Sequence, residues 1–257
     1  MDSGFYSAFA GFSTRMDALD ILANNLANVS TVAYKSQSEF YRSLNAALNG
    51  SGDTGVVPAS LHSLLNQSIN RFGVLGGTRL DLGQGTLEPT GNDTDLALEG
   101  SGFFVVQTRN GLRYTRNGSL SLNKDRLLVT QEGDPVLSQQ SAGRNQPIQI
   151  PSGKFSISPD GTISSDGALV AKLRIEDFAP GTDLQREGNS YYTAPPDAAK
   201  PSTATVRQGM LEASNADAVR STVALMDLQR TAQLMERALS IFHNEFNRTA
   251  AQDLPRV

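Results

Sequence analysis

The sequence contains no cysteine and only two histidines, His62 and His243. The missing cysteines exclude disulfide bridges, thiolate zinc sites and thiol nucleophiles. Two histidines are too few for a multi-histidine metal site. The sequence also lacks a glycine-rich phosphate-binding loop followed by Lys-Ser or Lys-Thr. These absences remove much of the usual catalytic repertoire, and we expect a protein that is not an enzyme and holds no metal or cofactor.

Long apolar runs and an excess of positive charge are missing as well. No run approaches the ~20 apolar residues that cross a bilayer. The N-terminus lacks a basic leader followed by an apolar stretch, so we expect no membrane-spanning helix and no cleaved signal peptide. The 26 acidic residues outnumber the 22 basic ones, which argues against nucleic-acid binding that rests on overall basicity. At 257 residues the chain is long enough for one large or two ordinary domains.

A regular apolar spacing near the N-terminus predicts a long helix. Its apolar residues are separated alternately by four and three positions, over roughly 32 Å of helix. They are Phe5, Phe9, Phe12, Met16, Leu19, Ala23 and Leu26. The polar run at residues 24–31 favours a turn or cap, because Asn and Ser compete for backbone hydrogen bonds. The spacing therefore predicts one apolar face along a helix that ends in this run.

The C-terminal part shows the same alternation of three and four. The seam residues are Leu225, Leu228, Ala232, Met235, Leu239, Phe242 and Phe246. Ser214 or Asn215 is expected as the N-cap, with Asp217 favourable near the positive end of the helix dipole. We expect the two terminal helices to pair as a coiled-coil-like stalk. Leu22, Val223 and Leu234 flank the seams and would stay exposed, so the seams are the candidate assembly interface.

The middle of the chain, residues 85–209, has the pattern of an all-β domain. Short apolar or alternating runs occur at residues 103–106, 127–129 and 171–176. Turn signals separate them, at Asn110-Gly111, Asn117-Gly118, Asp160-Gly161 and Asp166-Gly167. Parallel βαβ spacing does not occur, so we predict an antiparallel sandwich or barrel and an α+β protein overall.

These patterns divide the chain into four parts. They are a helical segment at residues 1–35, a connection at 36–84, the β-rich domain at 85–209 and a second helical segment at 210–257. In the connection, Phe40, Leu44 and Leu48 suggest that a helix continues or restarts. The stretch from Gly50 to Pro58 indicates a flexible break.

Candidate catalytic residues are few and weakly specified. Ser121 and Lys124 match a Ser-x-x-Lys nucleophile pattern, but they lie in a strand-rich hairpin and such short matches arise by chance. Asp93 and Asp95 could form an acid–base pair on a glycan, although adjacent acids in a turn are common. A β-rich protein that binds or cleaves cell-wall glycans is therefore kept as the alternative function.

Several blocks of the sequence resemble the bacterial flagellar basal-body rod and hook protein family. The blocks are residues 23–29 followed by Tyr34-Lys35, residues 90–106, residues 114–119 continued by 128–137, and residues 208–215. The residues that carry the resemblance are Asn24, Asn25, Leu26, Asn28, Gly102, Phe103, Thr115, Arg116, Gly118, Glu212, Ser214 and Asn215. Ala33 is a departure, because the family commonly has glycine there and alanine lacks easy access to positive φ.

The resemblance implies a structural subunit of the rod, the axial shaft that carries motor torque to the hook. It implies that both terminal helices form an inner layer and that the β-domain lies outside them. The length favours a rod member over the larger hook protein, with a proximal rod type first and a distal type second. Implied partners are other rod proteins, copies of this chain and the flagellar export apparatus. The implied location is the periplasmic rod of the basal body.

Overall fold

The computed structural model describes residues 2–42, 74–139, 146–151, 153–188, 190–195 and 197–253. It divides the chain into two compact units. The helical unit comprises Met1–Ala27, Gln37–Arg79 and Asp217–Val257. The β-rich unit comprises Asn28–Ser36 and Leu80–Ala216. Both ends of the chain therefore belong to the same unit.

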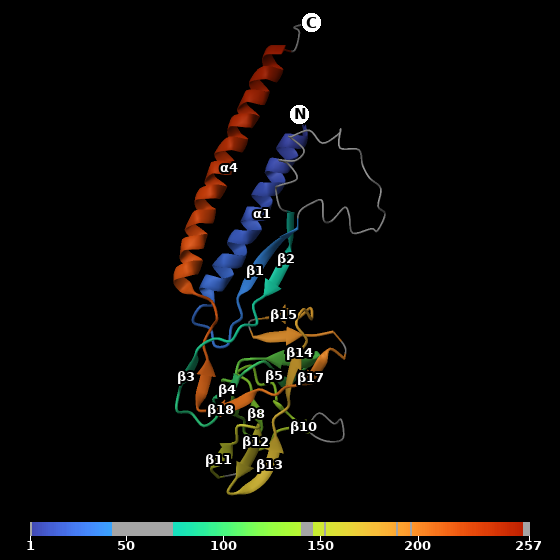
Figure 1. The fold of residues 1–257 in the computed structure, drawn as a ribbon, viewed down its shortest axis with the longest axis vertical. Coiled ribbons are helices and arrows are strands. Elements are labelled where there is room, and N and C mark those ends of the chain that lie inside the picture. Colours follow the sequence, from blue (N-terminus) through green and yellow to red (C-terminus); the bar gives the residue numbers. More distant parts are fainter. Residues whose placement is uncertain are drawn as a thin grey trace. The chain divides into compact units, whose positions relative to one another are not determined.

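Two long helices make up most of the helical unit. Helix α1 covers Asp2–Ala27 and helix α4 covers Ala218–Asp253. The helices contact one another (Figure 1), and α1 also contacts strand β1 at Gln37–Arg42. Strand β1 pairs with β2, Val74–Leu80, in a two-stranded sheet. The terminal helices expected from the apolar spacing are confirmed, and α1 ends within the polar run at residues 24–31.

The N-cap of α4 differs from the expected one. Asp217 precedes the helix, and its Oδ1 accepts a hydrogen bond from the Arg220 N–H at 3.0 Å. Its carbonyl accepts the first helical bond from Ser221 N–H at 2.9 Å. Asp217 is therefore the cap, and the prediction of Ser214 or Asn215 was wrong. A carboxylate suits this position because it also interacts favourably with the helix dipole.

The helix expected at Phe40 is also wrong. Phe40 lies in strand β1, where the apolar spacing of the sequence gave no sign of a period of two. Leu44, Leu48 and the stretch from Gly50 to Pro58 lie outside the described residues. Asn25 supplies the local reason for an extended chain here. Its side-chain amide accepts from Gln37 N–H at 2.9 Å and donates to Gln37 C=O at 2.7 Å, which imitates a neighbouring strand.

The β-rich unit consists of short strands. They are β3 Leu87–Pro89, β4 Leu96–Glu99, β5 Phe103–Thr108, β6 Gly111–Thr115, β7 Ser121–Leu122, β8 Leu128–Val129, β9 Leu137–Ser138, β10 Gln146–Pro147, β11 Phe155–Ile157, β12 Thr162–Ser165, β13 Ala168–Lys172, β14 Ile175–Phe178, β15 Gln185–Glu187, β16 Tyr191–Thr193, β17 Ala199–Pro201, β18 Thr205–Gln208 and β19 Met210–Glu212.

The largest sheet has six strands in the order β15-β16-β6-β5-β14-β17. A three-stranded sheet has the order β11-β12-β13, and the pairs β18-β4, β19-β3, β10-β9 and β7-β8 complete the unit. The registers of these strand pairs are antiparallel. Terminal helices with an antiparallel, β-rich middle confirm the α+β class (Figure 1).

The turn dipeptides had mixed outcomes. Hairpins close at Asn110-Gly111, Asp160-Gly161 and Asp166-Gly167, joining β5 to β6, β11 to β12 and β12 to β13. Asn117-Gly118 instead lies in a loop between strands of different sheets. There the Leu96 N–H donates to the Gly118 carbonyl at 2.9 Å. The glycine is required by this close approach to another segment, not by a hairpin.

The run at residues 171–176, predicted as one strand, is divided between two sheets. Strand β13 ends at Lys172 and β14 begins at Ile175. The two residues between them bond to different segments: Leu173 N–H donates to Gly161 C=O at 2.8 Å and Arg174 N–H to Leu137 C=O at 3.0 Å. An alternating pattern shows which residues are half-buried, but it does not show where a strand changes partner.

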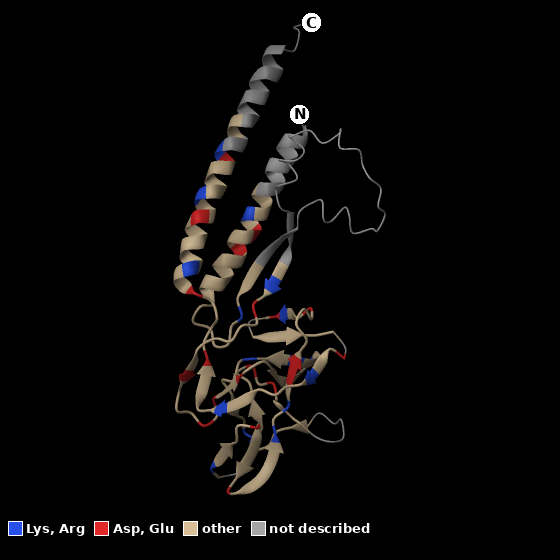
Figure 2. Ribbon diagram, viewed as in Figure 1, with Lys and Arg blue, Asp and Glu red and all other residues tan. Residues whose placement is uncertain are grey.

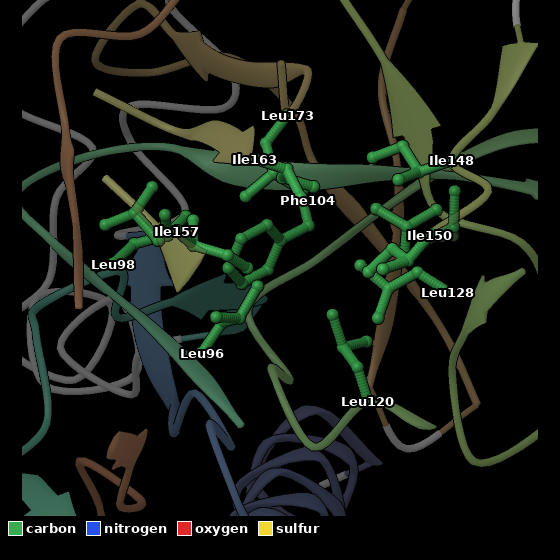
Figure 3. Close-up of a cluster of buried hydrophobic side chains, with 13 residues drawn as sticks. Leu96, Leu98, Phe104, Leu120, Leu128, Ile148, Ile150, Ile157, Ile163 and Leu173 are labelled. Carbon is green, nitrogen blue, oxygen red and sulfur yellow. The ribbon is translucent and has the colours of Figure 1, made fainter. Parts of the chain in front are cut away.

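One apolar cluster fills the β-rich unit (Figure 3). Its members come from strands of several sheets and from the loops between them: Leu96, Leu98, Phe104, Val106, Leu120, Leu128, Val136, Ile148, Ile150, Ile157, Ile163, Leu173 and Val206. A smaller cluster joins Phe103, Phe178, Leu184 and Tyr192. Short strands that are only marginally stable alone are thus held by a shared core.

Candidate functional site

The apolar seam expected on α1 is only partly buried. Phe12, Leu19 and Leu26 are half-buried, whereas Met16 is 43% exposed and Ala23 is exposed. The most buried side chains of α1 lie on another side of the helix, at Thr14, Ala18 and Asn25. Phe5 and Phe9 lie on α1, but their side chains are outside the described part. The helix therefore presents an apolar, partly exposed surface beside its buried face.

The seam of α4 is also half-buried, at Leu225, Leu228 and Met235, with Ala232 buried. Leu239, Phe242 and Phe246 lie on the helix, and their side chains are outside the described part. A second apolar row stands more exposed than the seam. Its apolar members are Val219, Val223, Met226, Leu234 and Ile241, with exposed fractions between 55% and 75%.

Sequence reasoning found two members of this second row, Val223 and Leu234, and treated them as flanks of the seam. The signal for the whole row was present in a spacing of 11 residues. Val219 and Ile241 stand 11 positions on either side of Arg230, and Val223 precedes Leu234 by the same interval. A repeat of 11 keeps residues on one face of a nearly straight helix, because 11 residues make just over three whole turns.

The segment that follows α1 is buried in the β-rich unit. Ala33, Tyr34 and Lys35 have exposed fractions of 3%, 1% and 0%. Ala33 adopts φ +54°, so alanine occupies a position that favours glycine. Its N–H donates to the Glu212 carbonyl at 2.7 Å. The Arg186 guanidinium lies over the Tyr34 ring, 4.1 Å from its centroid, which is a cation–π contact.

A buried charge network surrounds the Glu212 carboxylate. Oε1 accepts from Lys35 Nζ at 2.6 Å and from Gly85 N–H at 2.8 Å, while Oε2 faces Arg116 Nη1 at 3.4 Å. Lys35 also donates to Gly83 C=O at 2.7 Å. The side chains of Lys35, Arg116 and Glu212 are at most 3% exposed. Two cations thus share one carboxylate where water cannot screen them.

Burial sets the direction of the pKa shifts in this network. It lowers the pKa of Lys35, and the hydrogen bond and charge of Glu212 oppose that shift. It also lowers the pKa of Arg116, again against the attraction of Glu212. Arg116 donates from Nη2 to Gly100 C=O at 2.6 Å and its guanidinium lies 5.4 Å from the centroid of the Phe103 ring. The carboxylate of Glu212 is therefore what makes both buried cations tolerable.

Three segments of the β-rich unit meet at what we name the junction triad, Ser36, Asp81 and Asn215. Asn215 Oδ1 accepts from Ser36 N–H at 2.7 Å. Asn215 Nδ2 donates to Asp81 C=O at 2.8 Å, and Asp81 N–H donates to Ser36 C=O at 2.8 Å. Asn215 thus does not cap a helix, because its side chain satisfies the backbone of two other segments.

The remaining motif residues fix the backbone. Thr115 Oγ1 donates to Ser190 C=O at 2.8 Å. A Cβ at Gly118 would stand 1.6 Å from the Leu96 carbonyl oxygen, and one at Gly102 would stand 2.5 Å from Ser202 Oγ. Phe103 packs edge-on to Tyr192 at 5.5 Å between centroids. Ser214 Oγ accepts from Ala216 N–H at 3.1 Å. Asn24, Leu26 and Asn28 lie at and just after the end of α1.

Of the residues considered as catalytic candidates, Asp95 has a structural role. Asp95 is buried, and its Oδ2 accepts from Thr90 Oγ1 at 2.6 Å and Asn92 Nδ2 at 3.0 Å, which closes a turn. Asp93 and Ser121 are exposed. His62 and the side chain of His243 lie outside the described residues. Within the described part, no three His, Asp or Glu side chains gather as a metal site, and no helix is apolar enough over a bilayer's thickness to span a membrane.

Comparison with known proteins finds family models that match the N-terminal region and part of the β-rich unit. Residues 5–35 match the family model described as flagella basal body rod protein. Residues 97–165 match the model described as flagellar hook protein FlgE/F/G D1 domain. The flagellar basal-body rod protein FlgF of Caulobacter vibrioides is 31% identical over 100% of both chains. The chain belongs to the flagellar basal-body rod protein family.

Other rod proteins support the same assignment. FlgF of Mesorhizobium japonicum is 30% identical over 93% of this chain and 95% of its own. The rod protein FlgG of Bacillus subtilis is 29% identical over 89% of this chain and 90% of its own. These relatives support the FlgF type first and the FlgG type second, as the sequence blocks predicted. This rod protein is accordingly a structural subunit, and the glycan-directed alternative is not favoured.

Proposed function

We propose that this rod protein assembles through its terminal helices into the axial shaft that transmits motor torque to the hook. Its partners are other rod proteins and copies of itself, after delivery by the flagellar export apparatus, and its location is the periplasmic part of the basal body. The role is mechanical and needs no catalytic residue, metal or cofactor. The proposal is supported by full-length similarity to proteins named for the rod.

The observation that carries the assembly role is the apolar surface left on α4. Val219, Val223 and Leu234 each expose more than 60% of their surface in the chain alone. Burying one side chain of this size contributes about 1.5–3 kcal/mol. Several such side chains in one row form an exposed patch of the kind that marks a protein interface. A subunit that completes its apolar contacts only beside neighbours is suited to a cooperative shaft.

We further propose how the parts divide the work. The heptad spacing of α1 and α4 supports a coiled-coil-like stalk made from the two ends of the chain. The antiparallel sheets and the shared apolar cluster support a sandwich- or barrel-like outer domain. The boundaries expected from the sequence, 1–35, 36–84, 85–209 and 210–257, serve this division if Asn28–Ser36, Leu80–Gln84 and Met210–Ala216 are added to the outer domain.

The seam residues provide the test. In a strain that lacks its own copy of the gene, the variant Leu225→Asp with Leu228→Asp should fail to restore motility and should be missing from isolated basal bodies. The matched control is Leu169→Asp, because Leu169 is an apolar residue exposed at the β-rich unit, 76% accessible. The near-ultraviolet circular dichroism of the seam variant should show a folded β-rich unit. Wild-type motility with the seam variant would contradict the proposal.

A further inference from the structure

The exposed row on α4 contains apolar and charged residues, and both of its charged residues are basic. We name it the α4 outer stripe: Val219, Val223, Met226, Arg230, Leu234, Arg237 and Ile241. At about 100° per residue these seven positions fall within roughly 80° of the helix circumference. The acids Asp227 and Glu236 project outside this arc, by about 20° and 80°. An apolar row whose only charges are two arginines is therefore available on the surface.

Helix α1 has a smaller exposed face with the opposite charge. We name it the α1 outer face: Met16, Asp17, Asp20 and Ala23. All four side chains are exposed, and no ion pair between described residues involves Asp17 or Asp20. Arg230 and Arg237 are likewise absent from those ion pairs. Figure 2 shows the acidic and basic residues along the described parts of both helices.

The contact between the helices inside one chain leaves these surfaces free. Among the side chains that the structure describes, the buried ones of α1 are Thr14, Ala18 and Asn25, and those of α4 are Ser221 and Ala232. The outer face and the outer stripe lie on other sides of their helices. Both surfaces are therefore left for another molecule, and each supplies what the other lacks. One has two acids beside Met16 and Ala23, and the other has five apolar side chains with two bases.

We propose that the α1 outer face of one copy docks on the α4 outer stripe of the next copy. This inference rests on the proposed function, and it specifies which surfaces meet. Asp17 and Asp20 would face Arg230 and Arg237, while Val223, Met226 and Leu234 would cover the small surface around Ala23. Charges of opposite sign fix register and steer association, and the apolar side chains supply most of the affinity.

The two surfaces differ, so the contact is heterologous. Each copy keeps a free outer face at one side and a free outer stripe at the other. Such a contact repeats from copy to copy and produces a ring or an open helical array, whereas a two-fold contact would stop at a dimer. Each added copy thus exposes the same two surfaces, and further copies can be added to them.

Charge reversal tests this pairing on the full chain. The variants Asp17→Arg/Asp20→Arg and Arg230→Asp/Arg237→Asp should each weaken self-association at least about tenfold in sedimentation velocity. The variant with all four changes should recover most of it, because the signs are opposite again. Asp227→Arg/Glu236→Arg is the matched control, since it changes exposed charges of α4 outside the stripe and should associate like the wild type.

A mixture of the two reversed variants separates a heterologous contact from a two-fold one. In the mixture, each surface of one variant is opposite in charge to the matching surface of the other, so equal amounts should associate alternately and grow beyond dimers, whereas each variant alone stays dissociated. Mixed association that stops at one-to-one dimers would indicate a two-fold contact and would overturn the heterologous one. Far-ultraviolet circular dichroism shows whether each variant keeps its helices. If the variant with all four changes has wild-type helicity but stays dissociated, the pairing would be overturned.

Two further outcomes distinguish the inference from the proposed function. A wild-type chain that remains monomeric at about 1 mM would overturn the docking of copies on one another, because such a contact would contribute less than about 4 kcal/mol. Normal motility with the single-helix reversals would also overturn it, while the rod role would stand. Loss of motility with Leu225→Asp/Leu228→Asp tests the rod role alone.

Discussion

The buried carboxylate of Glu212 offers the sharpest test of what holds the β-rich unit together. The change Glu212→Gln keeps the shape of the side chain but removes its charge. Lys35 and Arg116 would then face a neutral amide at sites where they are at most 3% exposed. Breaking a buried ion pair by removing one partner costs about 3–5 kcal/mol, because the remaining charge stays desolvated. We expect a loss in that range.

A companion change on the other side of the pair should cost less. In Lys35→Met, Glu212 keeps the Gly85 N–H at 2.8 Å and Arg116 Nη1 at 3.4 Å. The Gly83 carbonyl, which loses Lys35, still accepts from Asn215 Nδ2 at 3.1 Å. No buried charge is left alone, so we expect about 1–2 kcal/mol.

Urea unfolding followed by near-ultraviolet circular dichroism measures both losses. The sequence has no tryptophan and six tyrosines. Tyr34, Tyr114, Tyr191 and Tyr192 lie in the β-rich unit, so the tyrosine signal reports mainly on it. The order of the two variants is the critical result. A Glu212→Gln loss below about 1 kcal/mol, or one smaller than that of Lys35→Met, would refute the role given to the carboxylate.

Three other changes probe backbone and burial. Ala33→Gly should stabilise the chain by up to about 1 kcal/mol, because relief at φ +54° is partly offset by unfolded-state entropy; a lower urea midpoint would contradict this. Gly118→Ala should cost at least about 3 kcal/mol, because the new methyl group collides with the Leu96 carbonyl. Gly133→Ala meets no atom within 4 Å and should cost about 1 kcal/mol. Equal urea midpoints for the two variants would count against the steric reason. Burial raises the pKa of Tyr192 to about 12, so the folded state holds a proton that the unfolded state releases and stability falls as pH rises from 10 to 12. Tyr192→Phe should reduce that fall by up to about 2.7 kcal/mol, checked by urea midpoints across this range.

Periodicity predicted the terminal helices because a helix repeats the same relation between neighbours over many residues. The seams from Phe5 to Leu26 and from Leu225 to Phe246 are long enough for such a pattern to emerge. Hairpins were predicted where two residues decide the turn, as at Asp166-Gly167. Strand exchange at Leu173 could not be predicted, because it depends on which distant carbonyl, here that of Gly161, lies within reach.

The buried network was the largest omission from the sequence reasoning. Lys35, Arg116 and Glu212 were identified as motif residues through resemblance, without a physical reason for their charges and without the contact between them. Lys35 and Glu212 are 177 positions apart, and their contact at 2.6 Å follows from the fold of the whole unit. Nothing local marks a lysine as buried, since most lysines remain in water. Its partner becomes visible only when the segments are placed in space.

The junction triad affects how tension passes along the chain. The segments that contain Ser36, Asp81 and Asn215 each continue directly into residues of the helical unit. Hydrogen bonds of 2.7 and 2.8 Å join these three segments to one another. A pull that enters through one of these segments is therefore passed to the others before it reaches the apolar core. The β-rich unit is mechanically in parallel with this short link rather than in series with it. We therefore expect the apolar core to carry little of such a pull.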